Sequence, residues 1–217
     1  MGHETANPLS CSMSSYAQPL QNRVTPLGEV VAIPQRGSLM GNRGCLHDND
    51  GIIRYRWKGK RWITCALEYK DNKVPLRAPG RYTPLFFKDE VSALAAGHRP
   101  CSQCRRPAYR AFMAAVEMVR GLNPGSLRAD QIDAELHSER MAKRTEGKLD
   151  SGQISRLPDG AIIVSSGSLW VKDGRKLSLW RWGRPLARID GGPFVLTPAL
   201  ALAALAGGYL PDTSGTH

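Results

Sequence analysis

The segment Gly97-His98-Arg99-Pro100-Cys101-Ser102-Gln103-Cys104-Arg105-Arg106-Pro107 carries the strongest structural signal in this chain of 217 residues. Two residues separate its two cysteines, and a turn of this length directs both thiols to the same side. Zinc is a metal ion that proteins commonly bind through such a pair. The neighbouring arginines and the helix that Pro107 is expected to begin favour the thiolate form. The segment therefore predicts a zinc site on a basic surface.

A tetrahedral zinc shell requires two further ligands. Cys65 is the expected third ligand, because strand periodicity would place Ile63 and Cys65 on one inward face. We expect His47 to be the fourth ligand, since its loop could reach over the site, and keep Cys45 and His98 as alternatives. The competing interpretation is that these cysteines are buried apolar thiols without a metal.

Positive charge is concentrated in the part of the chain that holds these cysteines. Residues 36–110 contain 16 Lys and Arg against 6 Asp and Glu, in a chain whose net charge is +11. Such a segment favours a polyanionic partner, because each phosphate that it neutralises releases counterions. We expect nucleic acid, with DNA favoured over RNA, although a solvated basic face would give the same count. The candidate contacts, which are interleaved with Tyr55, Trp57 and Trp62, are Arg54, Arg56, Lys58, Lys60, Arg61, Arg99, Arg105 and Arg106.

The composition is that of a soluble globular protein, with 41% hydrophobic and 23% charged residues. No apolar run reaches the roughly 18 residues that cross a bilayer, so no membrane partner is expected. The first residues lack the pattern of a secretion signal, which predicts a cytoplasmic protein with reduced thiols. Five cysteines, an odd number, fit a metal site better than a set of disulfides.

The predicted fold class is α+β, with a small β-hairpin and helix metal module, linking helices and a small β-rich C-terminal domain. The boundaries that we expect are a disordered tail over 1–20, a zinc-binding domain over 21–125, a linking helix over 126–150 and the β-rich domain with a terminal helix over 151–217. Within these, a hairpin is expected over 52–69, and helices are expected over 90–96, from 107 to about 120, over 128–144 and over 199–206. Asp89 is the expected N-cap of the first helix.

The chain also contains two similar segments, which are related by a constant offset of 111 residues. Leu85, the 93–95 segment, Gly97 and Pro100 correspond to Leu196, the 204–206 segment, Gly208 and Pro211. The pattern predicts strand, helix and glycine stop twice, and the second copy has no cysteines. Chance similarity between two alanine-rich helices is the alternative to a duplication.

The segment Phe86 to Cys104, with its Ala-Leu-Ala-Ala-Gly-x-Arg-Pro-Cys-x-x-Cys core, resembles the end of the Ada-type zinc-binding domain of bacterial adaptive-response DNA-repair proteins. The similarity covers about residues 62–106. In that family a zinc ion held by four cysteines activates one of them to accept a methyl group from a DNA methylphosphotriester. The resemblance implies that Cys101 and Cys104 are the downstream pair and that Cys65 is the acceptor. Tyr69 stands where the family has its remaining cysteine, which would make Cys65 a poorer nucleophile.

Three hypotheses follow. The first is a zinc protein that binds DNA in repair or regulation, without turnover chemistry. The second is single-turnover alkyl transfer to Cys65 as a catalytic residue. The third is a structural zinc in an interaction protein whose C-terminal unit binds another partner, although at least two of Trp170, Trp180 and Trp182 are expected in the core.

Overall fold

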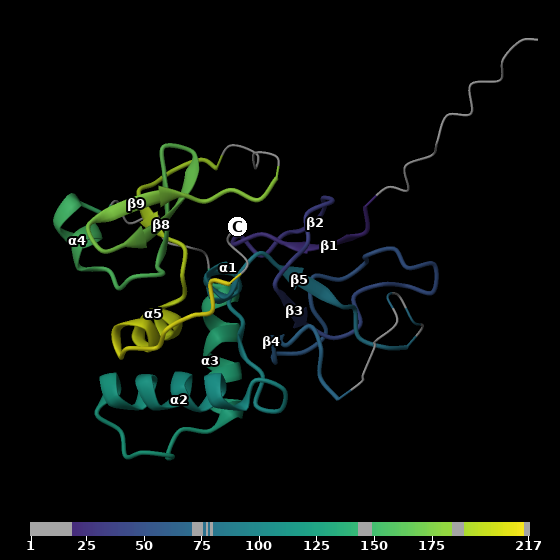
Figure 1. Cartoon of the computed structure of the whole chain (residues 1–217), viewed down its shortest axis with the longest axis horizontal. Coiled ribbons are helices and arrows are strands. Elements are labelled where there is room, and N and C mark those ends of the chain that lie inside the picture. The colour runs from purple at the N-terminus through teal and green to yellow at the C-terminus, as the bar shows by residue number, and fades with distance from the viewer. Residues whose placement is uncertain are drawn as a thin grey trace, which may run out of the picture.

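The computed structural model describes residues 19–70, 76, 78, 80–142, 149–183 and 189–214. Its helices and two sheets confirm the α+β class. The sheets lie on either side of the short helix α1, helices α2, α3 and α5 lie below it, and α4 lies beside the second sheet (Figure 1). Nearly all of the predicted tail over 1–20 lies outside the described residues.

The elements are short, and the strands form two sheets, one from residues 21–100 and one from residues 162–195. The first sheet contains β1 (Gln21–Val24), β2 (Val30–Ala32), β3 (Leu39–Asn42), β4 (Ile63–Cys65), β5 (Leu85–Phe87) and β6 (Arg99–Pro100). The second contains β7 (Ile162–Ser165), β8 (Ser168–Asp173), β9 (Lys176–Leu179) and β10 (Phe194–Val195). The helices are α1 (Glu90–Ala95), α2 (Arg106–Arg120), α3 (Ala129–Met141), α4 (Ser151–Arg156) and α5 (Ala199–Ala206). None of the described helices combines the length and apolarity that a bilayer crossing requires.

The first sheet has the order β2-β1-β5-β3-β4-β6 and corrects the predicted hairpin. β4 pairs antiparallel with β3 and parallel with β6, so its partners come from outside the 52–69 segment. The residues before β4 form a loop that is tied down by the amide of Lys58, which donates to the carbonyl oxygen of Arg43 over 2.8 Å. Arg54, Tyr55 and Arg56 are all exposed. The hairpin fails because these residues offer no apolar face for a strand to bury.

The second sheet has the order β10-β7-β8-β9. Trp180 and Trp182 are buried in its hydrophobic cluster, which confirms that at least two of the three C-terminal tryptophans belong to the core. Residues of α1 complete this cluster, so the sheet is not a separate layer with its own closed core.

Helix α1 lies at the centre of the molecule and contributes residues to all three hydrophobic clusters. Asp89 caps it as expected, because its carboxylate accepts from the Ser92 amide over 2.7 Å. All of its residues are buried: Val91 faces the cluster of the second sheet, Ala93 that of the first sheet, and Leu94 a third cluster among the helices. A short helix without an exposed face fits this central position.

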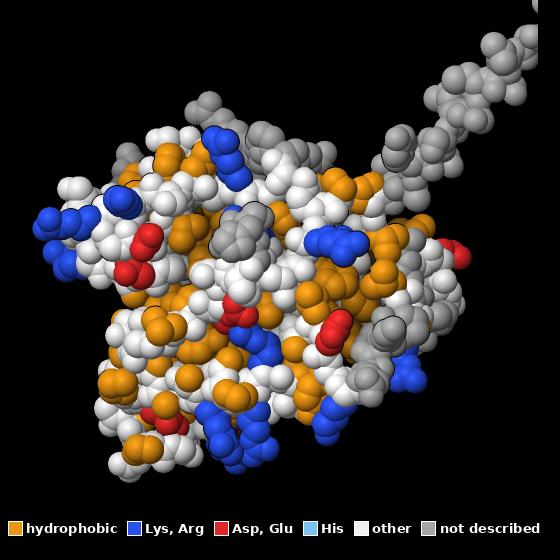
Figure 2. Space-filling view, in the orientation of Figure 1, with side chains coloured by type: hydrophobic (Ala, Val, Ile, Leu, Met, Phe, Trp, Pro, Cys, Tyr) orange, Lys and Arg blue, Asp and Glu red, His pale blue; other side chains and the backbone are white. Residues whose placement is uncertain are grey.

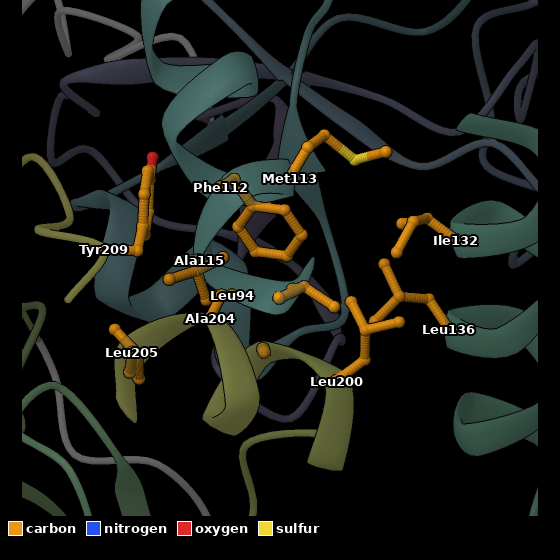
Figure 3. Packing of buried hydrophobic residues seen from close by; sticks show 12 residues of the cluster. Leu94, Phe112, Met113, Ala115, Ile132, Leu136, Leu200, Ala204, Leu205 and Tyr209 are labelled. Atoms are coloured by element: carbon orange, nitrogen blue, oxygen red, sulfur yellow. The ribbon is translucent and has the colours of Figure 1, made fainter. Parts of the chain in front are cut away.

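The third cluster joins α2, α3 and α5 (Figure 3). Phe112 and Tyr209 lie edge to face with ring centroids 5.4 Å apart, and Leu136 and Leu200 are fully buried beside them. Helix α5 thus packs on α2 from the first half of the chain. The hydrophobic core therefore crosses the boundaries expected at residues 125 and 150.

Candidate metal centre

Strand register brings three cysteines together. The parallel pairing of β4 with β6 sets Ile63 opposite Arg99 and Thr64 opposite Pro100, and the Cys101 amide donates to the Thr64 carbonyl oxygen over 2.9 Å. The next residue on each strand is a cysteine, so Cys65 meets Cys101. Cys104 follows in the turn before α2, and the three Sγ atoms lie within 4.8 Å of one another. We call Cys65, Cys101 and Cys104 the thiol triad.

The triad lies at the edge of the interior, and backbone amides donate hydrogen bonds to it. Cys65 and Cys101 are buried, whereas Cys104 is half-buried. The Gln103 amide donates to the Cys101 sulfur over 3.4 Å. The contact with the Cys65 thiol, together with the amides of Cys104 and Gln103, lowers the pKa of Cys101 although burial opposes this. The hydrogen bond to Cys101 and burial raise the pKa of Cys65, and burial raises that of Cys104. A cation bound among the three sulfurs would favour their thiolate forms.

Two buried ion pairs hold the cysteine turn in place. Arg99 donates to both carboxylate oxygens of Asp133 on α3, over 2.8 and 2.7 Å. Arg105 donates to both oxygens of Glu90 over 2.5 and 2.8 Å, and the Tyr209 hydroxyl also donates to Glu90 over 2.8 Å. These pairings correct the expectation that Arg99 and Arg105 contact nucleic acid, because their guanidinium groups point into the protein.

The structure does not bring the expected fourth ligand, His47, to the triad. Its Nδ1 lies 2.6 Å from Thr83 Oγ1 and its Nε2 lies 3.4 Å from the Ala78 carbonyl oxygen. The alternatives do not join the triad either: Cys45 donates to the His47 carbonyl oxygen, and His98 Nε2 accepts from Arg43 Nε over 3.1 Å. Among the described residues the group contains three cysteines and no histidine.

The described donor set suits a soft metal ion such as zinc and leaves one tetrahedral position for another ligand. Three thiolates are soft donors that suit this ion, and three protein ligands with an open fourth position are typical of reactive zinc sites. Tyr82, which sequence reasoning missed, lies near the triad: burial and then the charges of the three thiols raise the pKa of its phenol. No motif marks Tyr82, because it lies in a segment without periodicity.

The remaining predicted nucleic-acid contacts are on the surface. Arg54, Arg56, Lys58, Lys60, Arg61 and Arg106 are all exposed. Arg54 pairs with Asp48 over 2.7 Å, and the Lys58 ammonium lies 3.6 Å from the centroid of the Tyr55 ring. The 54–61 loop therefore offers a run of cations with an exposed aromatic ring beside it.

A second concave feature lies away from the triad. A groove of about 940 Å³ runs between β8–β9 and the end of α5, and is lined among others by Lys172, Trp180, Leu205 and Tyr209. Hydrophobic side chains fill the space between the second sheet and α5 on this face of the molecule (Figure 2). Basic and acidic residues are balanced along the groove, which contains no thiol.

Comparison of the chain with family models, with curated proteins and with solved structures finds no match. The resemblance to Ada-type domains therefore rests on the residue pattern around the triad.

Proposed function

We propose that this protein binds zinc through the thiol triad and binds DNA through the exposed cations of the 54–61 loop and Arg106. The observation that carries the metal assignment is the convergence of three sulfurs within 4.8 Å at the ends of two paired strands. The exposed loop leads directly into β4, the strand that carries Cys65, which supports a joint metal-and-DNA surface. A role in DNA repair or regulation, in the manner of the Ada-type domains that the cysteine segment resembles, is part of this proposal.

Zinc bound to the triad would supply electrostatic stabilisation of thiolates at neutral pH and one open coordination position. Cys65 and Cys101 would bind the ion at the ends of β4 and β6, and Cys104 would bind it from the turn before α2. The Arg99–Asp133 and Arg105–Glu90 pairs would hold the turn rigid when the metal is bound.

The DNA-binding proposal is tested by fluorescence anisotropy with a labelled duplex of about 20 base pairs at increasing salt. Six exposed cations would give a slope of log K against log salt of up to about −5. Lys60→Ala should weaken binding and make the slope shallower. Lys176→Ala, an equally exposed lysine on β9, is the control and should change neither. Absence of binding, or binding indifferent to salt, would rule the proposal out.

Alkyl transfer is the second candidate, and relative exposure favours a particular acceptor. Cys65 is buried, whereas Cys104 is the most accessible sulfur of the triad. In such a step the thiolate attacks the methyl carbon of a phosphotriester, the carbon–oxygen bond breaks, and the phosphodiester leaves with the electron pair. Peptide mass spectrometry after incubation with methylphosphotriester DNA should then find a methyl group on Cys104 rather than Cys65. Absence of any adduct would exclude this candidate and leave the DNA-binding proposal standing.

A further inference from the structure

Four buried nitrogen atoms without a hydrogen-bond partner gather around Trp62. In the described part of the chain six buried side-chain polar atoms lack a partner, and four of them are Arg43 Nη2, Arg140 Nε, His98 Nδ1 and His137 Nδ1. Folded proteins leave few such atoms unpaired, and a cluster of them requires an explanation. We call Arg43, His98, His137 and Arg140, with Trp57 and Trp62, the Trp62 cluster.

Ring contacts link the members of this cluster. The guanidinium carbons of Arg43 and Arg140 lie 4.0 and 4.2 Å from the centroid of the Trp62 ring. The His98 ring lies 5.1 Å from Trp62. His137 lies edge-on to Trp57 at 5.8 Å, and Trp57 is 6.4 Å from Trp62. The unpaired nitrogens therefore share one neighbourhood.

Among the described residues, neither arginine of the cluster forms a salt bridge. Arg43 is only 1% exposed, and its hydrogen bonds go to neutral acceptors, His98 Nε2 and the Gly28 carbonyl oxygen. Arg140 likewise donates to two carbonyl oxygens, those of Gly97 over 2.5 Å and Lys60 over 2.7 Å. Burial, reinforced by Arg140 and Arg56, lowers the pKa of Arg43 to about 9. Burial also lowers the pKa of Arg140 to about 10.

Buried Arg99 and half-buried Arg105 are paired differently. Arg99 and Arg105 each form a two-pronged ion pair with a carboxylate. Asp133 and Glu139 favour the charged form of Arg140, but their carboxylates bond elsewhere: Asp133 binds Arg99, and Glu139 accepts from the Leu200 amide. Water could pair the free nitrogens but would not neutralise the charge. A bound anion would do both.

We propose that the Trp62 cluster and the adjoining end of the 54–61 loop form a binding site for a phosphate group. Arg140 and His137 are half-buried at the rim, and Lys60 and Arg56 are exposed beside them, so the anion approaches from the loop side. Arg43 supplies positive charge from the buried side of the site. Contact with the Trp62 ring fixes the planes of the Arg43 and Arg140 guanidinium groups. The phosphate is either free or part of a nucleic-acid backbone, and only the second form rests on the proposed function.

The first test measures inorganic phosphate binding to the full chain by thermal unfolding and titration calorimetry, with chloride at equal ionic strength as the reference. Phosphate up to about 50 mM should raise the melting temperature, as expected for a ligand that binds the folded state. Arg140→Met should weaken phosphate binding at least tenfold, and Lys60→Met, an exposed change that cannot disrupt the core, should weaken it severalfold. Lys176→Met should bind like the parent protein. Stabilisation no greater than that by chloride, or unchanged binding in both cluster variants, would overturn the proposal.

The second test distinguishes the two sources of phosphate with the duplex-binding assay. If Lys60→Met and Arg140→Met weaken both phosphate and DNA binding, the site takes a backbone phosphate. If they weaken phosphate binding alone, whether or not DNA binds, the site takes free phosphate. DNA binding by a protein that does not respond to phosphate would refute this site while leaving the proposed function intact.

Discussion

The four described cysteines all belong to the first half of the chain, and three of them meet. The spacing of Cys101 and Cys104 predicts their proximity directly. Strand alternation also places Cys65 inward, and the register of β4 against β6 completes the triad. The expectation for His47 fails because Thr83 and Ala78 approach its ring nitrogens, and contacts between distant segments leave no mark in local spacing.

The buried imidazole of His98 yields a prediction at the residue scale. Burial, followed by the charges of Arg43 and Arg140, holds the pKa of His98 well below its ordinary value of 6.5. Below pH 6.5 the unfolded chain therefore binds a proton at His98, whereas the imidazole ring in the folded protein stays neutral. The free energy of unfolding should consequently fall as the pH is lowered, by up to about 1.4 kcal/mol per pH unit from this group.

Urea denaturation of the parent protein and of His98→Gln between pH 7.5 and 5 measures this effect. Gln can still accept from Arg43 but does not titrate, so the variant should lose less stability on acidification. Loss of metal in acid affects both proteins and cancels in the comparison. Equal pH dependence in the two proteins would contradict the account.

At the scale of elements, helix ends were predictable and strand pairing was not. The two segments related by an offset of 111 residues illustrate that helix ends were predictable, because α1 and α5 end in the same way. The His98 amide donates to the Ala93 carbonyl oxygen over 2.9 Å, and the Tyr209 amide donates to that of Ala204 over 3.0 Å. Gly97 and Gly208 both have positive φ, +80° and +89°. Helix capping depends on neighbouring residues and can be predicted from the sequence. The strand β4, by contrast, pairs with strands outside its own segment.

The close approach of α5 to α2 provides a prediction at the element scale. A Cβ on Gly207 would lie 2.3 Å from the carbonyl oxygen of Ala115 in α2, and backbone cannot move aside as a flexible side chain can. The φ of Gly207 is −78°, so the cost of Gly207→Ala is the contact alone. We expect a loss of about 1–3 kcal/mol, as for overpacked cores.

For a chain of this size that loss corresponds to a fall in melting temperature of roughly 2–12 °C, which scanning calorimetry resolves. Ala206→Ser changes the exposed neighbour and should leave the melting temperature nearly unaltered. A Gly207→Ala protein as stable as its parent would show that the two helices are farther apart than described.

At the scale of the whole molecule, the sequence indicates the fold class but not how the parts share a core. Composition shifts suggested a separate unit over 151–217. Instead α5 packs on α2, and the buried carboxylate of Glu90 accepts from the Tyr209 hydroxyl and the Asp212 amide, over 2.8 and 2.9 Å. Glu90 also holds Arg105, which links the chain's last described segment to the cysteine turn.

Removal of residues 151–217 should therefore unfold the half that holds the thiol triad rather than release it as a folded domain. We expect the shortened chain to lack a cooperative thermal transition by circular dichroism, because it loses part of two hydrophobic clusters and leaves Glu90 with fewer donors. A fragment that melts cooperatively and binds zinc like the full chain would show that the first 150 residues are an independent domain.

The central claim is that the triad binds zinc, and elemental analysis of protein purified without added metal tests it most directly. We expect about one zinc per chain, and its loss in Cys65→Ser and Cys101→Ser. Cys45→Ser is the matched control, because Cys45 is half-buried like Cys104 but bonds to the His47 carbonyl oxygen instead. The control should retain its zinc. Parent protein without zinc, or equal loss in Cys45→Ser, would contradict the assignment.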